Sequence, residues 1–251
     1  MQWQPNLVLL REGTQLGCAW SQGWSQGSEV DGCFADQTYW STLDKSPLHG
    51  GRWHNRLLTF DGHAHKLVNG VSWQIFPTQN PTMLRSGRLL VPVTLEHSSP
   101  MMRRAAVLIS DDNGDSFILS NSSQPADNLQ GQWETTVWEP TDSKNSTEIF
   151  MFDRNNSGTL TLRADQRMLY AKSANAGVSW TALQAVNVEA VVARMLVTPL
   201  SGDLFMMVHN DWKALNATTG DDCNRCHDRV NTAMWFNRGG GINFVQGPCV
   251  Q

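Results

Sequence analysis

Short apolar runs alternate with polar turns along the whole chain. The runs at residues 105–109, 168–172 and 204–208 are strand-sized, and polar or glycine-containing turns follow them. Residues 80–93 and 193–208 each have the pattern of a strand, a Ser-Gly turn and a second strand. No stretch keeps a helical period over three turns. The pattern therefore predicts an all-β chain built from antiparallel hairpins.

One turn motif recurs directly after such runs, with the pattern Ser-x-Asp/Asn-x-Gly-x-Ser-aromatic. Its defining residues are Ser110, Asp112, Gly114 and Phe117 in one copy and Ser173, Asn175, Gly177 and Trp180 in another. Less complete copies lie at residues 237–244 and 68–73. The closing aromatics, at positions 73, 117, 180 and 244, are 44, 63 and 64 residues apart. Because a four-stranded propeller blade needs about 40 to 50 residues, this spacing predicts one motif per blade, with insertions in the later blades.

The residue types of the motif predict a structural role. An Asp or Asn side chain at the third position can accept hydrogen bonds from backbone N–H groups further along and fix a tight turn. Glycine at the fifth position supplies a positive φ without steric cost. The closing Trp or Phe is expected to pack between neighbouring blades, where its large apolar area is buried. Catalytic residues are therefore expected elsewhere in the chain.

The length of 251 residues suits one large all-β domain with a sizeable core. We predict a single β-propeller of four-stranded antiparallel blades over residues 1–251, with residues 1–50 as a divergent first blade or a lead-in. Four to five blades are visible in the pattern, so an incomplete ring is expected.

Charge and composition exclude several partners. A net charge of −4 without any run of Lys and Arg argues against a nucleic-acid surface. The longest apolar runs are too short to cross a membrane as helices. Four Asn-x-Ser/Thr sequons, 11 Trp and a charged fraction of 17% favour a secreted or extracellular protein, or a periplasmic one. We expect a monomer that needs no cofactor and whose partner is a glycan.

The turn motif, with the Ser-Gly-Arg hairpin at residues 86–88 ahead of its first good copy, resembles the Asp-box repeats of the sialidase superfamily. The resemblance covers about residues 65 to 248 and implies a sialidase-like β-propeller. It indicates the fold more sharply than the reaction. Sialidases hold the sugar carboxylate with three arginines and use a Tyr–Glu pair and an Asp for catalysis. The resemblance thus implies an exo-glycosidase that hydrolyses sialosides or other terminal acidic sugars.

The same resemblance implies roles for single residues. Glu139, within a Trp-Glu-Pro triplet, looks like the Glu that polarises the nucleophile. Arg154, Arg167 and Arg229 lie where family arginines approach the sugar carboxylate, which a planar guanidinium fork binds through two hydrogen bonds. The sequence departs from the family in having no Arg-Ile-Pro segment and no late tyrosine. These departures leave two other functions open.

The first alternative is a uronic-acid lyase, or another glycosidase, that uses histidines near the amino terminus. His54 and His63 are the candidates, because a histidine can take up or release a proton near neutral pH. The second alternative is a propeller that binds glycan or protein without catalysis. His209 and Trp212 end a predicted inner strand in either case, and Trp212 could stack on a sugar ring or pack between blades.

A Cys-x-x-Cys-His segment begins at Cys223. Taken alone, this pattern is typical of haem attachment, and with a fourth ligand it could bind zinc. No helical pattern surrounds it, so an insertion loop held by a disulfide is the favoured interpretation, with the partners of Cys223 and Cys226 left open. No metal site is therefore predicted.

Overall fold

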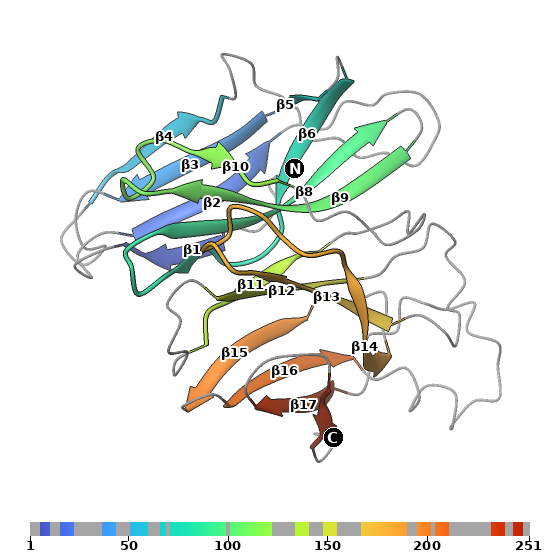
Figure 1. The fold of residues 1–251 in the computed structure, drawn as a ribbon. Coiled ribbons are helices and arrows are strands. Elements are labelled where there is room, and N and C mark those ends of the chain that lie inside the picture. Colours follow the sequence, from blue (N-terminus) through green and yellow to red (C-terminus); the bar gives the residue numbers. More distant parts are fainter. Residues whose placement is uncertain are drawn as a thin grey trace. The chain divides into compact units, whose positions relative to one another are not determined.

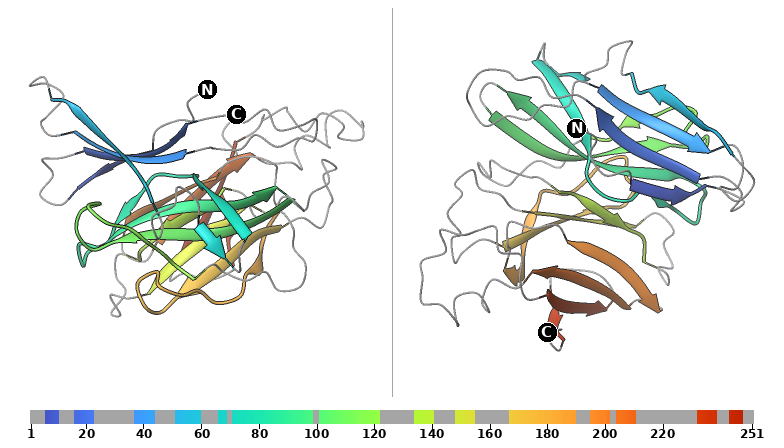
Figure 2. Two further views of the ribbon diagram at one scale, coloured as in Figure 1. Left: turned by 90° about the horizontal axis from the view of Figure 1, so that it is seen from above. Right: turned by 180° about the vertical axis from the view of Figure 1, so that it is seen from behind.

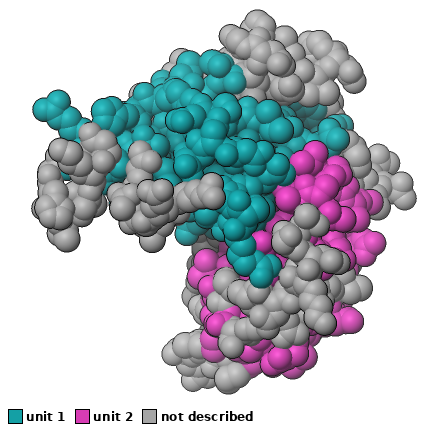
Figure 3. All heavy atoms as spheres, turned by 60° about the vertical axis from the view of Figure 1, so that its left-hand side comes forward, with its two compact units in different colours: residues 1–122 teal, residues 123–251 magenta. Residues whose placement is uncertain are grey.

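The computed structural model of the chain describes residues 6–10, 16–22, 37–43, 51–59, 66–68, 71–98, 101–121, 134–140, 148–154, 167–189, 195–201, 204–210, 232–238 and 243–247. The regular structure in these ranges is β-strand throughout (Figures 1 and 2). No helix found within them is long and apolar enough to span a bilayer. The chain divides into two compact units, residues 1–122 (unit 1) and residues 123–251 (unit 2) (Figure 3).

Unit 1 contains two antiparallel sheets. The first sheet has the order β1-β2-β3-β4 and consists of β1 (Asn6–Leu9), β2 (Leu16–Gln22), β3 (Gln37–Leu43) and β4 (Trp53–Leu57). The second sheet has the order β10-β9-β8-β6-β5, and a short β7 pairs with β8. Its strands are β5 (Lys66–Val68), β6 (Val71–Pro77), β7 (Thr82–Met83), β8 (Leu89–Ser98), β9 (Met101–Ser110) and β10 (Ile118–Leu119).

Unit 2 contains two four-stranded antiparallel sheets whose strands follow one another in sequence order. The third sheet consists of β11 (Thr136–Trp138), β12 (Ile149–Asp153), β13 (Arg167–Ser173) and β14 (Gln184–Glu189). The fourth consists of β15 (Leu196–Ser201), β16 (Leu204–Asn210), β17 (Thr232–Arg238) and β18 (Val245–Gln246). The prediction of four-stranded antiparallel sheets is thereby confirmed.

The turn motif joins the third and fourth strands of a sheet. Both complete copies and the copy at residues 237–244 take this place, between β9 and β10, β13 and β14, and β17 and β18. The copy at residues 68–73 does not, because it forms the β5–β6 hairpin at the start of the second sheet. Counting it as a repeat was therefore wrong.

The matching turn of the first sheet lies between β3 and β4. The sequence there carries Ser46, Gly50 and Trp53 at the first, fifth and eighth motif positions, although residues 44–50 lie outside the described ranges. With Trp53 as the first closing aromatic, the spacings to positions 117, 180 and 244 become 64, 63 and 64 residues. The repeat is thus uniform, and the insertions predicted for the later blades are not needed.

Side-chain hydrogen bonds hold both complete turns in the same way. The Ser110 hydroxyl donates to Oδ1 of Asp112 at 2.7 Å and accepts from the N–H of Gly114 at 2.7 Å. The N–H of Ser116 donates to the same Oδ1 at 2.8 Å. Three bonds of 2.9 Å repeat this network among Ser173, Asn175, Gly177 and Ser179. The fourth and fifth positions of both turns have φ between 53° and 91°, which is why glycine suits the fifth.

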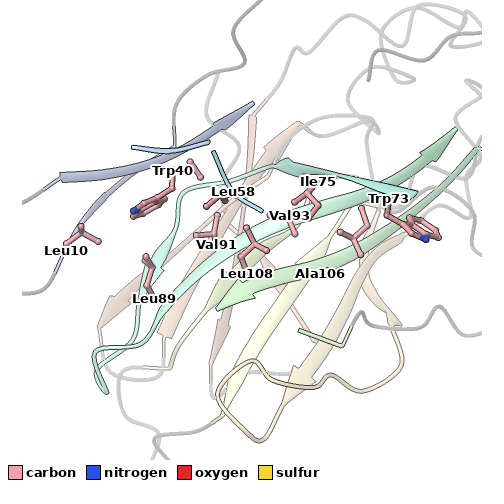
Figure 4. Packing of buried hydrophobic residues seen from close by; sticks show 12 residues of the cluster. Leu10, Trp40, Leu58, Trp73, Ile75, Leu89, Val91, Val93, Ala106 and Leu108 are labelled. Atoms are coloured by element: carbon pink, nitrogen blue, oxygen red, sulfur yellow. The ribbon is translucent and has the colours of Figure 1, made fainter. Parts of the chain in front are cut away.

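The closing aromatics pack against the sheet that precedes their own within each unit. The Phe117 ring meets Trp40 of β3 edge-on, with centroids 5.3 Å apart. The Phe244 ring meets Phe152 of β12 at 5.5 Å in the same manner, and the Asn187 side chain pairs with the backbone N–H and C=O of Phe244 at 2.8 and 2.9 Å. Figure 4 shows Trp40 within the apolar cluster of unit 1. The turn motif therefore anchors one sheet to the next.

Asp112 and Asn175 occupy the same place in the two turns, which allows a test by pH. Burial raises the pKa of Asp112, but hydrogen bonds from Ser116 and Ser110 together outweigh it and lower the pKa to about 2. An aspartate in an unfolded chain has a pKa of about 3.9, so this group stabilises the fold above pH 4 and the gain is lost as pH falls towards 2. Asp112→Asn should give unit 1 a flatter stability profile between pH 4 and 2, measured by urea unfolding. Parallel profiles for the two proteins would contradict the assignment.

Candidate functional site

The third sheet has two chemically different ends. β13 runs from Arg167 to Ser173, where the turn motif begins. The opposite end is formed by the start of β11, the end of β12 and the start of β13, because Thr136 pairs with Phe152 and Asp153 pairs with Leu169. We call this second end the polar end, since charged side chains gather there.

Four residues at the polar end form one buried cluster. Arg154 Nη1 lies 2.6 Å from Oε2 of Glu134, and these side chains are only 6% and 8% exposed. The hydroxyl of Thr135 donates to Oδ1 of Asp153 at 3.0 Å. The strand register explains the pairing, since continuing β11 back from Thr136 brings Glu134 opposite Arg154 and Thr135 opposite Asp153. A guanidinium held by a buried carboxylate keeps one orientation.

Asp153 is completely buried and its electrostatics are unusual. Burial is the largest influence and raises the pKa of Asp153 to about 8, against the opposing effects of the Thr135 hydrogen bond and the Arg154 charge. The carboxylate of Glu134 adds to the rise, because it is a like charge that shares the same arginine. Oδ2 of Asp153 has no hydrogen-bond partner among the residues that the structure describes. At neutral pH this group is therefore mostly a neutral carboxylic acid, able to donate a proton.

This assignment predicts how the stability of unit 2 responds to pH. The pKa of Asp153 is raised on folding, so its protonated form stabilises unit 2 fully below about pH 4, and that stabilisation is lost as pH rises towards 8. Hydrogen exchange of the β12 and β13 amides should accelerate over this range, beyond the intrinsic dependence on pH. Asp153→Asn should remove the excess. An excess that survives in the variant would show that another group is responsible.

Arg154 and Arg167 share the polar end, but Glu139 does not. Arg167 begins β13 and its Nη1 donates to the backbone oxygen of Asn187 at 3.2 Å. Glu139 follows Trp138, which pairs with Phe150 near the start of β12, so it lies at the end that carries the turn motif. It is five positions from Glu134, which is roughly 16 Å along a strand. Glu134, and not Glu139, is therefore the carboxylate at Arg154, and the role predicted for Glu139 stays a prediction.

The candidate histidines that the structure describes belong to other sheets than this cluster. His54 is exposed on β4 of the first sheet, in unit 1. His209 is buried near the end of β16 and its ring lies parallel to that of Trp235, with centroids 6.0 Å apart. His209 thus holds in the fourth sheet a place like that of Asp153 in the third, at the end of the second strand.

Several candidate residues lie outside the described ranges, namely His63, Trp212, Arg229, Cys223 and Cys226. Among the described residues, no group of three His, Cys, Asp or Glu side chains is placed to hold a metal ion. The roles predicted for these five residues remain predictions.

Unit 1 carries a second buried ion pair at the equivalent end of its second sheet. Arg103 Nη2 lies 2.7 Å from Oε1 of Glu96, with side chains 10% and 5% exposed. Arg104 lies over the ring of Trp73, 5.1 Å from its centroid. Burial raises the pKa of Glu96, and Arg103 opposes the rise. Sequence reasoning missed Glu96, Glu134 and Asp153, although charged residues beside long apolar runs were a usable signal.

Comparisons with known proteins identify the fold. No protein-family model and no curated protein matches the sequence. A Hadza microbial sialidase superposes on 97% of the chain with a TM-score of 0.63 at 15% identity. A Trypanosoma rangeli sialidase in complex with the inhibitor DANA superposes on 94% with a TM-score of 0.61 at 12% identity. The chain has the fold of sialidase-like propellers.

The same fold occurs in proteins of other activities. The β-xylosidase RS223 superposes on 99% of the chain with a TM-score of 0.60 at 10% identity. A protein of unknown function from Dyadobacter fermentans covers 99% with a TM-score of 0.61 at 15% identity. The chain spans 44% and 37% of the length of the two sialidases, but 78% and 76% of these other two chains. At such low identities the superpositions establish the propeller fold alone. The reaction has to be argued from the chemistry of the site.

Proposed function

We propose that this chain is a carbohydrate-active propeller that acts as an exo-glycosidase on terminal acidic sugars. The observation that carries the proposal is the cluster at the polar end of the third sheet, where a neutral Asp153 lies beside an arginine fixed by Glu134. The same proposal includes a glycan as the partner. It also includes export from the cell, which the exposed sequon residue Asn121 supports.

The chemistry of the cluster supports an acidic sugar. Arg167 is partly exposed and Arg154 is buried, so Arg167 is the arginine that a ligand carboxylate would meet first. Because Glu134 already orders the Arg154 guanidinium, binding a carboxylate there requires little further loss of side-chain freedom. Asp153, held neutral by burial, has the protonation state required of a general acid at neutral pH.

Arginine variants test the proposal. Arg167→Ala should weaken binding of a sialic acid derivative such as DANA about tenfold to a hundredfold, because a charge-assisted hydrogen bond contributes about 1.5 to 3 kcal/mol. Calorimetry measures the affinity, and release of an aryl alcohol from an aryl sialoside measures turnover. Arg88→Ala is the matched control, since Arg88 binds Asp111 beside the first turn motif. Unchanged affinity in Arg167→Ala, or turnover of an aryl xyloside in place of the sialoside, would refute an acidic-sugar site.

A second candidate is a propeller that binds glycan without cleaving it. It is favoured by the burial of Asp153, which is 0% exposed and so out of reach of a bound sugar in this conformation. Binding of DANA with no turnover, in a protein where Asp153→Asn leaves affinity unchanged, would select this candidate.

A further inference from the structure

Asp153 belongs to the buried cluster of the polar end, but Glu134 is the residue that holds the arginine. Glu134 Oε2 lies 2.6 Å from Nη1 of Arg154, whereas Oδ1 of Asp153 accepts a hydrogen bond from the Thr135 hydroxyl at 3.0 Å. Asp153 is 0% exposed, so a bound sugar does not touch it in this conformation. Any effect of Asp153 on a ligand must therefore act through its charge.

The net charge of the cluster depends on Asp153. The carboxylate of Glu134 balances the guanidinium of Arg154, so the cluster has no net charge while Asp153 is neutral. Ionisation of Asp153 gives the cluster a net negative charge. Because buried charges are screened far less than charges in water, the ionised cluster would repel a ligand carboxylate at the polar end.

Arg167 would bring such a carboxylate within range of this charge. Leu169 is the residue of β13 opposite Asp153, so Arg167, two positions earlier, is a diagonal neighbour of Asp153 on the same face of the sheet. Diagonal neighbours lie about 7 to 8 Å apart, which puts a carboxylate bound to Arg167 roughly 10 Å from Asp153. At an effective dielectric constant of about 20, two like charges at about 10 Å change a binding constant roughly tenfold.

The groups around Asp153 set the pH at which it ionises. Burial raises its pKa to about 8, and among the charged groups Arg154 opposes the rise while Glu134 adds to it. On β13 the residue opposite Asp153 is apolar, and Arg167 is paired in the register with Glu189 of β14. Asp153 therefore changes its charge between about pH 7 and pH 9.

We propose that Asp153 sets the pH range in which this site binds an acidic sugar: its neutral form permits binding, and its ionised form repels the ligand carboxylate. The inference rests on the proposed function, because it concerns the same site. Since the coupling between two binding events is reciprocal, a bound carboxylate must in turn favour the neutral form of Asp153. The protein should therefore take up a proton as it binds the ligand under mildly alkaline conditions.

Binding of DANA as a function of pH provides the test. A tenfold coupling lowers the affinity about fivefold between pH 6 and pH 9 and causes uptake of about half a proton per ligand near pH 8.5. Calorimetry in two buffers with different ionisation enthalpies measures both quantities. Asp153→Asn, which cannot ionise, should bind DANA with equal affinity at both pH values and take up no proton.

A second variant and a control come from the same sheet. The Thr135 hydrogen bond lowers the pKa of Asp153, so Thr135→Val should move the loss of affinity to higher pH. Glu148→Gln is the matched control. Glu148 precedes Ile149, which pairs with Ser173 at the end of the sheet that carries the turn motif, so this variant should keep the pH dependence of the unmodified protein.

The experiment separates two kinds of failure. Absence of DANA binding even at pH 6 would remove the acidic-sugar site, and the role of Asp153 with it. Equal affinities of the unmodified protein at pH 6 and pH 9 would overturn the role of Asp153 alone. So would a loss of affinity at pH 9 that survives in Asp153→Asn.

Discussion

Replacing Glu134 by alanine should destabilise unit 2 by about 3 to 5 kcal/mol, the usual effect of removing one partner of a buried ion pair. Arg154 would keep its charge, because a guanidinium does not lose its proton in proteins, and that charge is almost entirely buried. Urea unfolding of the variant, followed by hydrogen exchange in β11 and β12, measures the loss.

The same substitution should also change the pH at which the neighbouring Asp153 ionises. Glu134 raises the pKa of Asp153 and Arg154 lowers it. Glu134→Ala should therefore make Asp153 ionise at lower pH, and the ionised Asp153 would partly replace Glu134 as the negative charge beside Arg154. The double variant with Asp153→Asn should therefore lose more stability at pH 8 than the sum of the single variants.

A matched control comes from the same sheet. Lys172 and Glu148 form an ion pair whose side chains are 40% and 27% exposed. Glu148→Gln should change stability by less than about 1 kcal/mol, because exposed pairs are screened by solvent. A loss for Glu134→Ala as small as the one for Glu148→Gln would contradict the buried pair.

Gly114→Ala should destabilise unit 1 by about 2 to 5 kcal/mol, for two separate reasons. Gly114 has φ of 91°, a conformation that costs a residue with a Cβ about 1 to 2 kcal/mol. The added Cβ would also lie 2.3 Å from Nε1 of the Trp40 ring. Overpacking of this kind costs about 1 to 3 kcal/mol. Thermal or urea unfolding of the variant measures the sum.

The second turn motif separates the two causes. Ala176 already has φ of 53°, so strain in the left-handed region alone is compatible with the fold. At Gly114 the added Cβ also clashes with Trp40, so Trp40→Leu should lower the cost of Gly114→Ala although it is destabilising alone. Strictly additive losses would show that Trp40 is not the obstacle. Arg56 also binds this turn, through the backbone oxygens of Gly114 and Asp115.

The turn motif and the strands around it could be predicted from the sequence because their causes are local. The hydrogen bonds of Asp112 and Asn175 join residues at most four positions apart. The apolar runs that flank the motif predict strands by composition and length alone. The copy at residues 68–73 misled for the same reason, since a hairpin ending in Ser-Trp forms equally well at the start of a sheet.

The candidate site could be predicted only in part. The resemblance to sialidases implied Arg154 and Arg167, and both lie at the polar end of the third sheet. The sequence does not show which carboxylate meets Arg154, because Glu134 precedes β11 and Glu139 follows it. The register of β11 against β12 decides between them, and that register depends on contacts between distant segments.

The sequence by itself thus determined the recurring turn, its structural role and the all-β architecture, since each follows from side chains within a few residues of one another. The tertiary structure alone decided that residues 68–73 form a hairpin at the start of a sheet, that Glu134 and not Glu139 pairs with Arg154, and that the pKa of Asp153 is raised. Burial and cross-strand pairing cause all three, and both arise only when strands far apart in the chain come together.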